Sequence, residues 1–107
     1  MTFDDFWTIY PHHAARSIRV MAKSKWDAIT SYGLAAKMRD GEGNIMVVDL
    51  KGTPEDIVKG AKAYAMSLDD RQYAQGAQVW LNRGRWMDFN DMDELAAKYD
   101  RIHAHKA

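Results

Sequence analysis

The chain has 107 residues, with 15 Lys and Arg against 15 Asp and Glu, so its formal net charge at pH 7 is zero. This length suits one domain with one modest core, and a hydrophobic content of 47% excludes wholesale disorder. No apolar run approaches the roughly 18 residues of a membrane span. The absence of Cys removes disulfides, thiolate metal sites and Cys nucleophiles.

Charge is unevenly distributed along the chain. Between residues 12 and 39 the only acid is Asp27, whereas acids predominate between residues 88 and 100. The basic residues of the first stretch are Arg16, Arg19, Lys23, Lys25, Lys37 and Arg39. The N-terminal third therefore carries a local positive field, which suits phosphate or an acidic protein surface. Alternatively, it pairs with the acidic C-terminal helix of the same domain.

The first half of the chain predicts two helices. Thr2 can cap a short helix that runs to about Ile9 and is stopped by Pro11, because the residue before a proline disfavours helix. A second helix is expected from about residue 14 to residue 32, with Gly33 as its end. Its apolar stripe consists of Ile18, Ala22, Trp26 and Ile29. Residues 34–38 either continue as helix or fray.

The middle of the chain contains a glycine-rich loop and the only run with strand character. Residues 40–44 form a loop by composition, and residues 45–50 are either an extended connector or half of a small hairpin. Thr53 followed by Pro54 then opens a third helix. Gly60 lowers the stability of that helix relative to an alanine, so we expect another element to pack closely there.

The last third predicts one helical turn at residues 77–82 and a final helix from Asp91 to about His103, capped by Asn90. The last few residues are expected to fray. No repeat or linker divides the chain, so residues 1–107 form a single small helical domain. The expected fold is mainly α: a compact bundle of about four helices with one short extended segment.

Two separated aromatic motifs resemble a small helical domain of phage and prophage replication proteins, found in replisome organisers and helicase-loader-like proteins. The matching residues are Phe6, Trp7, Tyr10, Pro11, Ala22 and Trp26, then Tyr64, Trp80, Leu81, Asn82 and Trp86. Where such proteins carry Lys or Arg after the Tyr-Pro pair, this chain has His12 and His13. The resemblance implies a non-enzymatic role in phage DNA replication. The partner would be single- or double-stranded DNA or a replication protein such as the replicative helicase, in the cytoplasm of a bacterial host.

Candidate binding residues lie in two basic stretches. His12, Arg16, Arg19 and Lys23 follow a 4-3-4 spacing, which places them on one helical face. That face is either a phosphate-binding surface or an ordinary solvated one, and we give the two interpretations equal weight. Arg83 and Arg85 flank Gly84 on a turn, with Trp86 beside them as a possible exposed base-stacking group. If the two stretches are adjacent in space, binding becomes the better interpretation.

Other site classes find little support in the sequence. The His12-His13 and His103-x-His105 pairs lack the further ligands that a zinc site needs, so we expect neither a metal nor a cofactor. No nucleotide-binding loop or nucleophile–base pair stands out, which argues against an enzyme. Two alternatives to the replication role stay open: a small phage-encoded inhibitor that docks on a host replication or defence complex, and a homo-oligomeric scaffold. The oligomeric state is not predicted.

Overall fold

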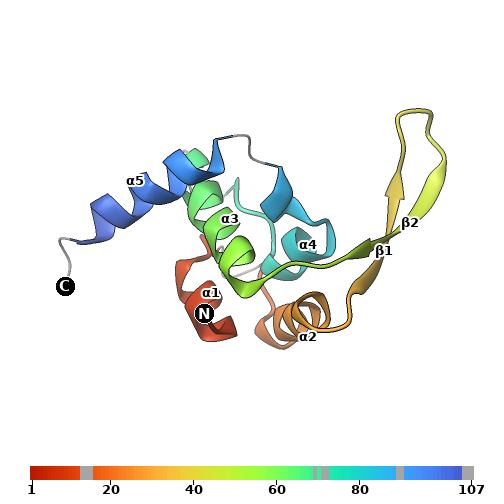
Figure 1. The fold of residues 1–107 in the computed structure, drawn as a ribbon, viewed down its shortest axis with the longest axis horizontal. Helices are drawn as coiled ribbons and strands as arrows, with labels where there is room; N and C mark the ends of the chain where they lie inside the picture. The colour runs from red at the N-terminus through yellow and green to blue at the C-terminus, as the bar shows by residue number, and fades with distance from the viewer. Residues whose placement is uncertain (13–15, 69, 71–72, 89–90, 105–107) are drawn as a thin grey trace.

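The computed structural model describes residues 1–12, 16–68, 70, 73–88 and 91–104, and shows a helical body from which a β-hairpin projects (Figure 1). The N-terminal half contains α1 (Phe3–Ile9), α2 (Arg19–Thr30), β1 (Leu34–Arg39) and β2 (Ile45–Leu50). The C-terminal half contains α3 (Pro54–Ser67), α4 (Ala77–Asn82), the 3₁₀ turn η2 (Arg85–Met87) and α5 (Met92–Ala104). The mainly α expectation is therefore confirmed, although the hairpin makes the fold more than a helix bundle.

The predicted helix starts of α1 and α3 are confirmed. Thr2 accepts a hydrogen bond from the Asp5 backbone N–H, and the Asp5 carboxylate accepts one from the Thr2 N–H in return. Thr53 caps α3 by accepting one hydrogen bond from the Asp56 N–H, with Pro54 in the first turn. In both helices a side-chain oxygen satisfies a backbone donor that has no partner within the helix.

Helix α2 is shorter than predicted, because it begins at Arg19 and not near residue 14. Tertiary hydrogen bonds hold the preceding backbone in a non-helical path: Gln78 accepts from the Ile18 N–H and donates to the Arg16 carbonyl. Ile18 itself is 47% exposed, so its predicted place in the buried stripe is wrong. The other three stripe residues, Ala22, Trp26 and Ile29, are buried as predicted.

Residues 34–38 form a strand, which corrects the expectation of continued helix. Gly33 turns the chain with a φ of 101°, a left-handed conformation that glycine adopts without strain. β1 then pairs with β2 in antiparallel register, Leu34 opposite Leu50 and Arg39 opposite Ile45. The half-hairpin alternative for residues 45–50 is thus the correct one.

The core is an aromatic cluster enclosed by α1, α2, α3 and α4. The Phe6 ring lies 5.9 Å from the Trp80 ring, which in turn lies 5.8 Å from the Tyr64 ring. Other buried members include Tyr10, Trp26, Ile57, Ala61, Leu81 and Trp86. Helix α5 packs outside this cluster along α3 and extends away from the hairpin (Figure 1). Asn90 and the final residues, 105–107, lie outside the described part, so the cap and the fraying stay predictions.

Candidate functional site

The structure divides the four residues that were expected to share one helical face. His12 and Arg16 precede α2, whereas Arg19 and Lys23 lie in its first two turns. The 4-3-4 spacing therefore does not produce a single helical stripe. The reason is the one that shortens α2: backbone groups around Ile18 bind the side chain of Gln78 and do not form a helical turn.

His12 contributes to the packing of the N-terminal segment. Its Nε2–H donates to the Trp7 carbonyl over 2.7 Å, and its ring lies 4.0 Å from the Trp7 ring. The ring of Tyr10 lies 5.3 Å away on the same segment. Since these contacts hold the chain as it turns after Pro11, His12 stabilises the fold at this point. The adjacent His13 lies outside the described residues.

Arg19 and Lys23 are exposed cations with local carboxylate partners. The Arg19 guanidinium pairs with Asp4 and lies 5.1 Å from the centre of the Phe3 ring, a cation–π arrangement. Lys23 pairs with Asp27 one helical turn further on, with an Nζ to Oδ1 distance of 2.6 Å. Exposed pairs of this kind contribute about 0–1 kcal/mol each, so phosphate can displace the carboxylates at little cost.

The Arg83–Trp86 turn exposes one of its cations and buries its tryptophan. Gly84 has a φ of 63°, and Arg83 before it is exposed with no ion-pair partner in the described part of the chain. Arg85 pairs with Asp88 and also donates to the Gln75 side chain. Trp86 is only 2% exposed, so its expected role as an open stacking surface is wrong. It lies against α3, where Gly60 leaves room for it.

The two basic stretches converge on one short segment. Arg16 donates to the Ala74 carbonyl over 3.3 Å, and Arg85 donates to the Gln75 side chain over 3.2 Å. Their guanidinium groups are therefore bound to consecutive residues, although Arg16 and Arg85 are 69 positions apart (85 − 16). The Gln75 backbone is fixed from the core side, because its carbonyl accepts from the Tyr10 hydroxyl and its N–H donates to that of Tyr64. One residue of each basic stretch, Arg16 and Arg85, therefore reaches the same short segment.

The aromatic motif residues assemble into one structural unit. The buried members, each less than 10% exposed, are Phe6, Tyr10, Trp26, Tyr64, Trp80 and Leu81, and Pro11 is buried with them. Trp7 is half-buried and packs against the same cluster. Burial also raises the pKa of Tyr10 above its usual range, with the neighbouring Tyr64 acting in the same direction. These residues build the core that holds the Ala74–Gln75 segment.

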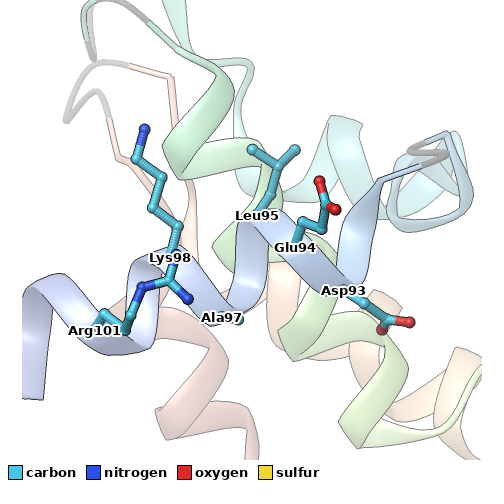
Figure 2. Close-up of a pocket in the computed structure, with 6 residues that line it drawn as sticks. All are labelled: Asp93, Glu94, Leu95, Ala97, Lys98 and Arg101. Carbon is cyan, nitrogen blue, oxygen red and sulfur yellow. The ribbon is translucent and has the colours of Figure 1, made fainter.

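Within the described residues, no acid of α5 pairs with a cation of the two basic stretches. The ion pairs of this helix are with α3: Asp93 with Lys59 and Asp100 with Lys62. The carboxylate of Asp93 raises the pKa of Lys59. Figure 2 shows a surface depression lined by six side chains of α5, with Lys98 and Arg101 towards one end and Asp93 and Glu94 towards the other.

One exposed apolar run, on β2, escaped the sequence analysis. Ile45, Met46 and Val47 on β2 are 65%, 48% and 68% exposed at the far half of the hairpin. A signal was present in the loop before them, since Asp40 and Gly43 suit a tight hairpin turn. That signal was not decisive, because residues 34–39 contain no β-branched or aromatic residue and did not look like a partner strand.

Over the described ranges, no three His, Asp or Glu side chains gather as a metal site would require. His103 stacks on Tyr99 at 3.9 Å, and His105 lies outside those ranges. None of the helices described is long and apolar enough to cross a membrane. Comparison of the chain with protein-family models, with curated proteins and with solved structures finds no match.

Proposed function

We propose that this chain is a non-enzymatic accessory protein of phage or prophage DNA replication, which binds DNA in the bacterial cytoplasm through its basic surface. We define that surface as Arg16, Arg19, Lys23, Arg83 and Arg85. The observation that carries the proposal is the convergence of Arg16 and Arg85 on consecutive residues of the Ala74–Gln75 segment. A phosphate backbone needs several cations on a rigid support, and the aromatic core fixes this segment through Tyr10 and Tyr64.

The chemistry of this surface favours phosphate contacts over base reading. Trp26, Trp80 and Trp86 are all buried, so none of the three can stack on bases. Exposed guanidinium and ammonium groups bind phosphate in any sequence, because phosphate contacts position a protein without specifying bases. We therefore expect DNA binding with weak sequence preference and a strong dependence on salt.

The decisive experiment compares two triple variants in a DNA-binding titration at several salt concentrations. In the first, Arg19, Lys23 and Arg83 are replaced by Gln, which removes three charges from the basic surface. In the matched control, the exposed Lys37, Lys98 and Arg101 are replaced by Gln, so the net charge falls equally. The basic-surface variant should bind far more weakly and show a smaller salt slope, because each lost phosphate contact lowers that slope by about 0.9. Equal losses in both variants, or no affinity of the wild type for DNA, would contradict the proposal.

The start of α2 favours a second candidate, a protein partner such as the replicative helicase or a host complex that the chain inhibits. Ile18, Val20 and Met21 are exposed beside Arg19, and Val20 is 75% exposed. Apolar side chains in a basic setting suit a partner surface with acidic and apolar residues. A titration with purified replicative helicase tests this candidate: Val20→Asp should abolish an association that the α5 variant Ala97→Asp leaves intact.

A further inference from the structure

We propose that the hairpin pairs two copies of this chain into a twofold-symmetric dimer, with β2 of one copy running antiparallel to β2 of the other. A two-stranded hairpin alone is marginally stable, and this one projects from the body with large apolar residues in water (Figure 1). Pairing at β2 would produce a four-stranded sheet. This inference concerns a different surface from the proposed DNA-binding one and does not depend on it.

The outer edge of β2 is free for pairing. The Asp40 N–H donates to the Asn44 carbonyl next to the turn, and hydrogen-bonded pairs alternate along an antiparallel ladder. Met38 opposite Met46 is consequently a bonded pair, and Lys37 opposite Val47 is not. The backbone N–H and carbonyl of Val47 therefore point away from β1, and no other segment of the described chain bonds to them.

The two edges of the hairpin differ, and the difference favours pairing at β2 over pairing at β1. β1 carries Lys37 and Arg39 on its exposed face, and charged side chains of this kind hinder pairing at an edge. β2 has four consecutive uncharged residues, Ile45–Val48, with no proline. In a dimer joined at β2 the two charged β1 strands become the outer edges of the sheet. Assembly would accordingly stop at two copies, as closed twofold symmetry requires.

In one register of the two β2 strands, the outer backbone groups bond to each other and no like charges come opposite each other. With Val47 opposite Val47 of the second copy, the outward-pointing backbone groups of both strands bond to each other. Met46 then lies opposite Val48 of the second copy on one face, and Ile45 lies opposite Asp49 on the other. No like charges face each other across this junction.

The same register brings opposite charges together at its ends. In this register the turn before β2 of one copy, which contains Glu42, lies beside the end of β2 of the other copy, which Lys51 directly follows. Both Glu42 and Lys51 are exposed and have no ion-pair partner within the described residues. The acidic turn of each hairpin thus meets a cation at the base of its neighbour. This complementarity favours a second copy over the DNA backbone, which the acidic turn would repel.

Solution mass tests the proposal. Wild type should show twice the 12.3 kDa chain mass in a light-scattering concentration series. Val47→Pro should halve that mass, since proline removes an N–H that the dimer needs and the hairpin does not use. Lys37→Pro is the matched control on the opposite edge and should stay dimeric. Wild type that stays at 12.3 kDa up to millimolar concentration would overturn the proposal, as would a Val47→Pro dimer.

Charge exchange and cross-linking test the register without proline. Glu42→Lys and Lys51→Glu should each weaken the dimer, and the double variant should restore it; failure of this rescue would overturn the register. Because the chain has no Cys, Val47→Cys should form a disulfide-linked dimer on oxidation, whereas Lys37→Cys should not. Directly opposed residues lie within the Cα separation of about 4.4–6.8 Å that a disulfide needs. Equal cross-linking of both variants would also overturn the proposal.

Discussion

Gly60 in the middle of α3 lies directly against Trp86 of the η2 turn. A Cβ atom added at Gly60 would come within 2.5 Å of the Trp86 Cβ and 2.7 Å of its Cα. The absence of a side chain therefore lets the turn approach the helix closely enough to bury the tryptophan. This contact joins the second aromatic motif to the core and fixes the adjacent Arg85.

Gly60→Ala should destabilise the protein even though alanine is the better helix former. The added methyl meets backbone atoms of Trp86, which cannot move aside as a flexible side chain could, and overpacking of this kind costs about 1–3 kcal/mol. Urea denaturation measures the loss in the free energy of unfolding. Gly41→Ala is the control, since nothing lies within 4 Å of a Cβ at that position. Equal stability of the two variants would show that the turn moves away freely.

The starts of α1 and α3 and most of the core aromatics could be predicted from the sequence because their causes are local or compositional. Thr2 and Thr53 cap helices through hydrogen bonds to residues three positions away, and buried tryptophans follow from apolar periodicity. The close approach predicted at Gly60 is also confirmed, and that prediction likewise came from a local feature of the sequence. A glycine in a helix has a local cost that only a tertiary contact explains.

The features that could not be predicted from the sequence depend on contacts between distant parts of the chain. The start of α2 is set by Gln78, 60 positions from Ile18, and β1 is a strand because β2 pairs with it. The convergence of Arg16 and Arg85 likewise requires the Ala74–Gln75 segment between them. No local pattern contains these relationships, so the two basic stretches were predicted but their adjacency was not.

Tyr10→Phe should lower the free energy of unfolding by more than the loss of an exposed hydroxyl would. The Tyr10 hydroxyl donates to the Gln75 carbonyl over 2.7 Å in a part-buried setting, and leaving such an acceptor unsatisfied costs about 1–3 kcal/mol. Thermal denaturation measures this loss. Tyr73→Phe is the control, because Tyr73 is exposed. A loss no larger than that of the control would mean that water replaces the hydroxyl.

Alkaline pH should destabilise the wild type more than Tyr10→Phe. Burial raises the pKa of Tyr10 above the ordinary value of 10.0, so the unfolded chain releases this proton at a lower pH than the folded one. The stabilising effect is complete below pH 10.0 and is lost as the pH rises above it. Unfolding free energies measured between neutral pH and pH 11 should converge for the two proteins. Parallel pH profiles would contradict this assignment.

Acid should disorder the hairpin turn. Backbone N–H groups of Asn44 and Glu42 donate to the Asp40 carboxylate and lower its pKa below the ordinary value of 3.8. Because the pKa is lowered in the folded state, the carboxylate stabilises the turn fully above the ordinary value of 3.8. This stabilisation is lost as the pH falls through the folded pKa. Amide chemical shifts of Glu42 and Asn44 should move together in an acid titration. In Asp40→Asn, which keeps an acceptor oxygen but has no titrating group at position 40, the shift of the Asn44 amide should change much less, because the Glu42 carboxyl is then the only titrating group of the turn.

Helix α5 should be held to α3 by packing more than by its ion pairs. Lys62–Asp100 is the better shielded of the two pairs, yet the Asp100 side chain is 61% exposed, and such pairs contribute about 0–1 kcal/mol. Ala96, by contrast, is buried against α3. Ala96→Asp should therefore increase amide hydrogen exchange throughout α5, because it places an unpaired charge in that interface. Asp100→Asn should change exchange only slightly, and a larger effect of Asp100→Asn than of Ala96→Asp would reverse this ranking of packing over charge.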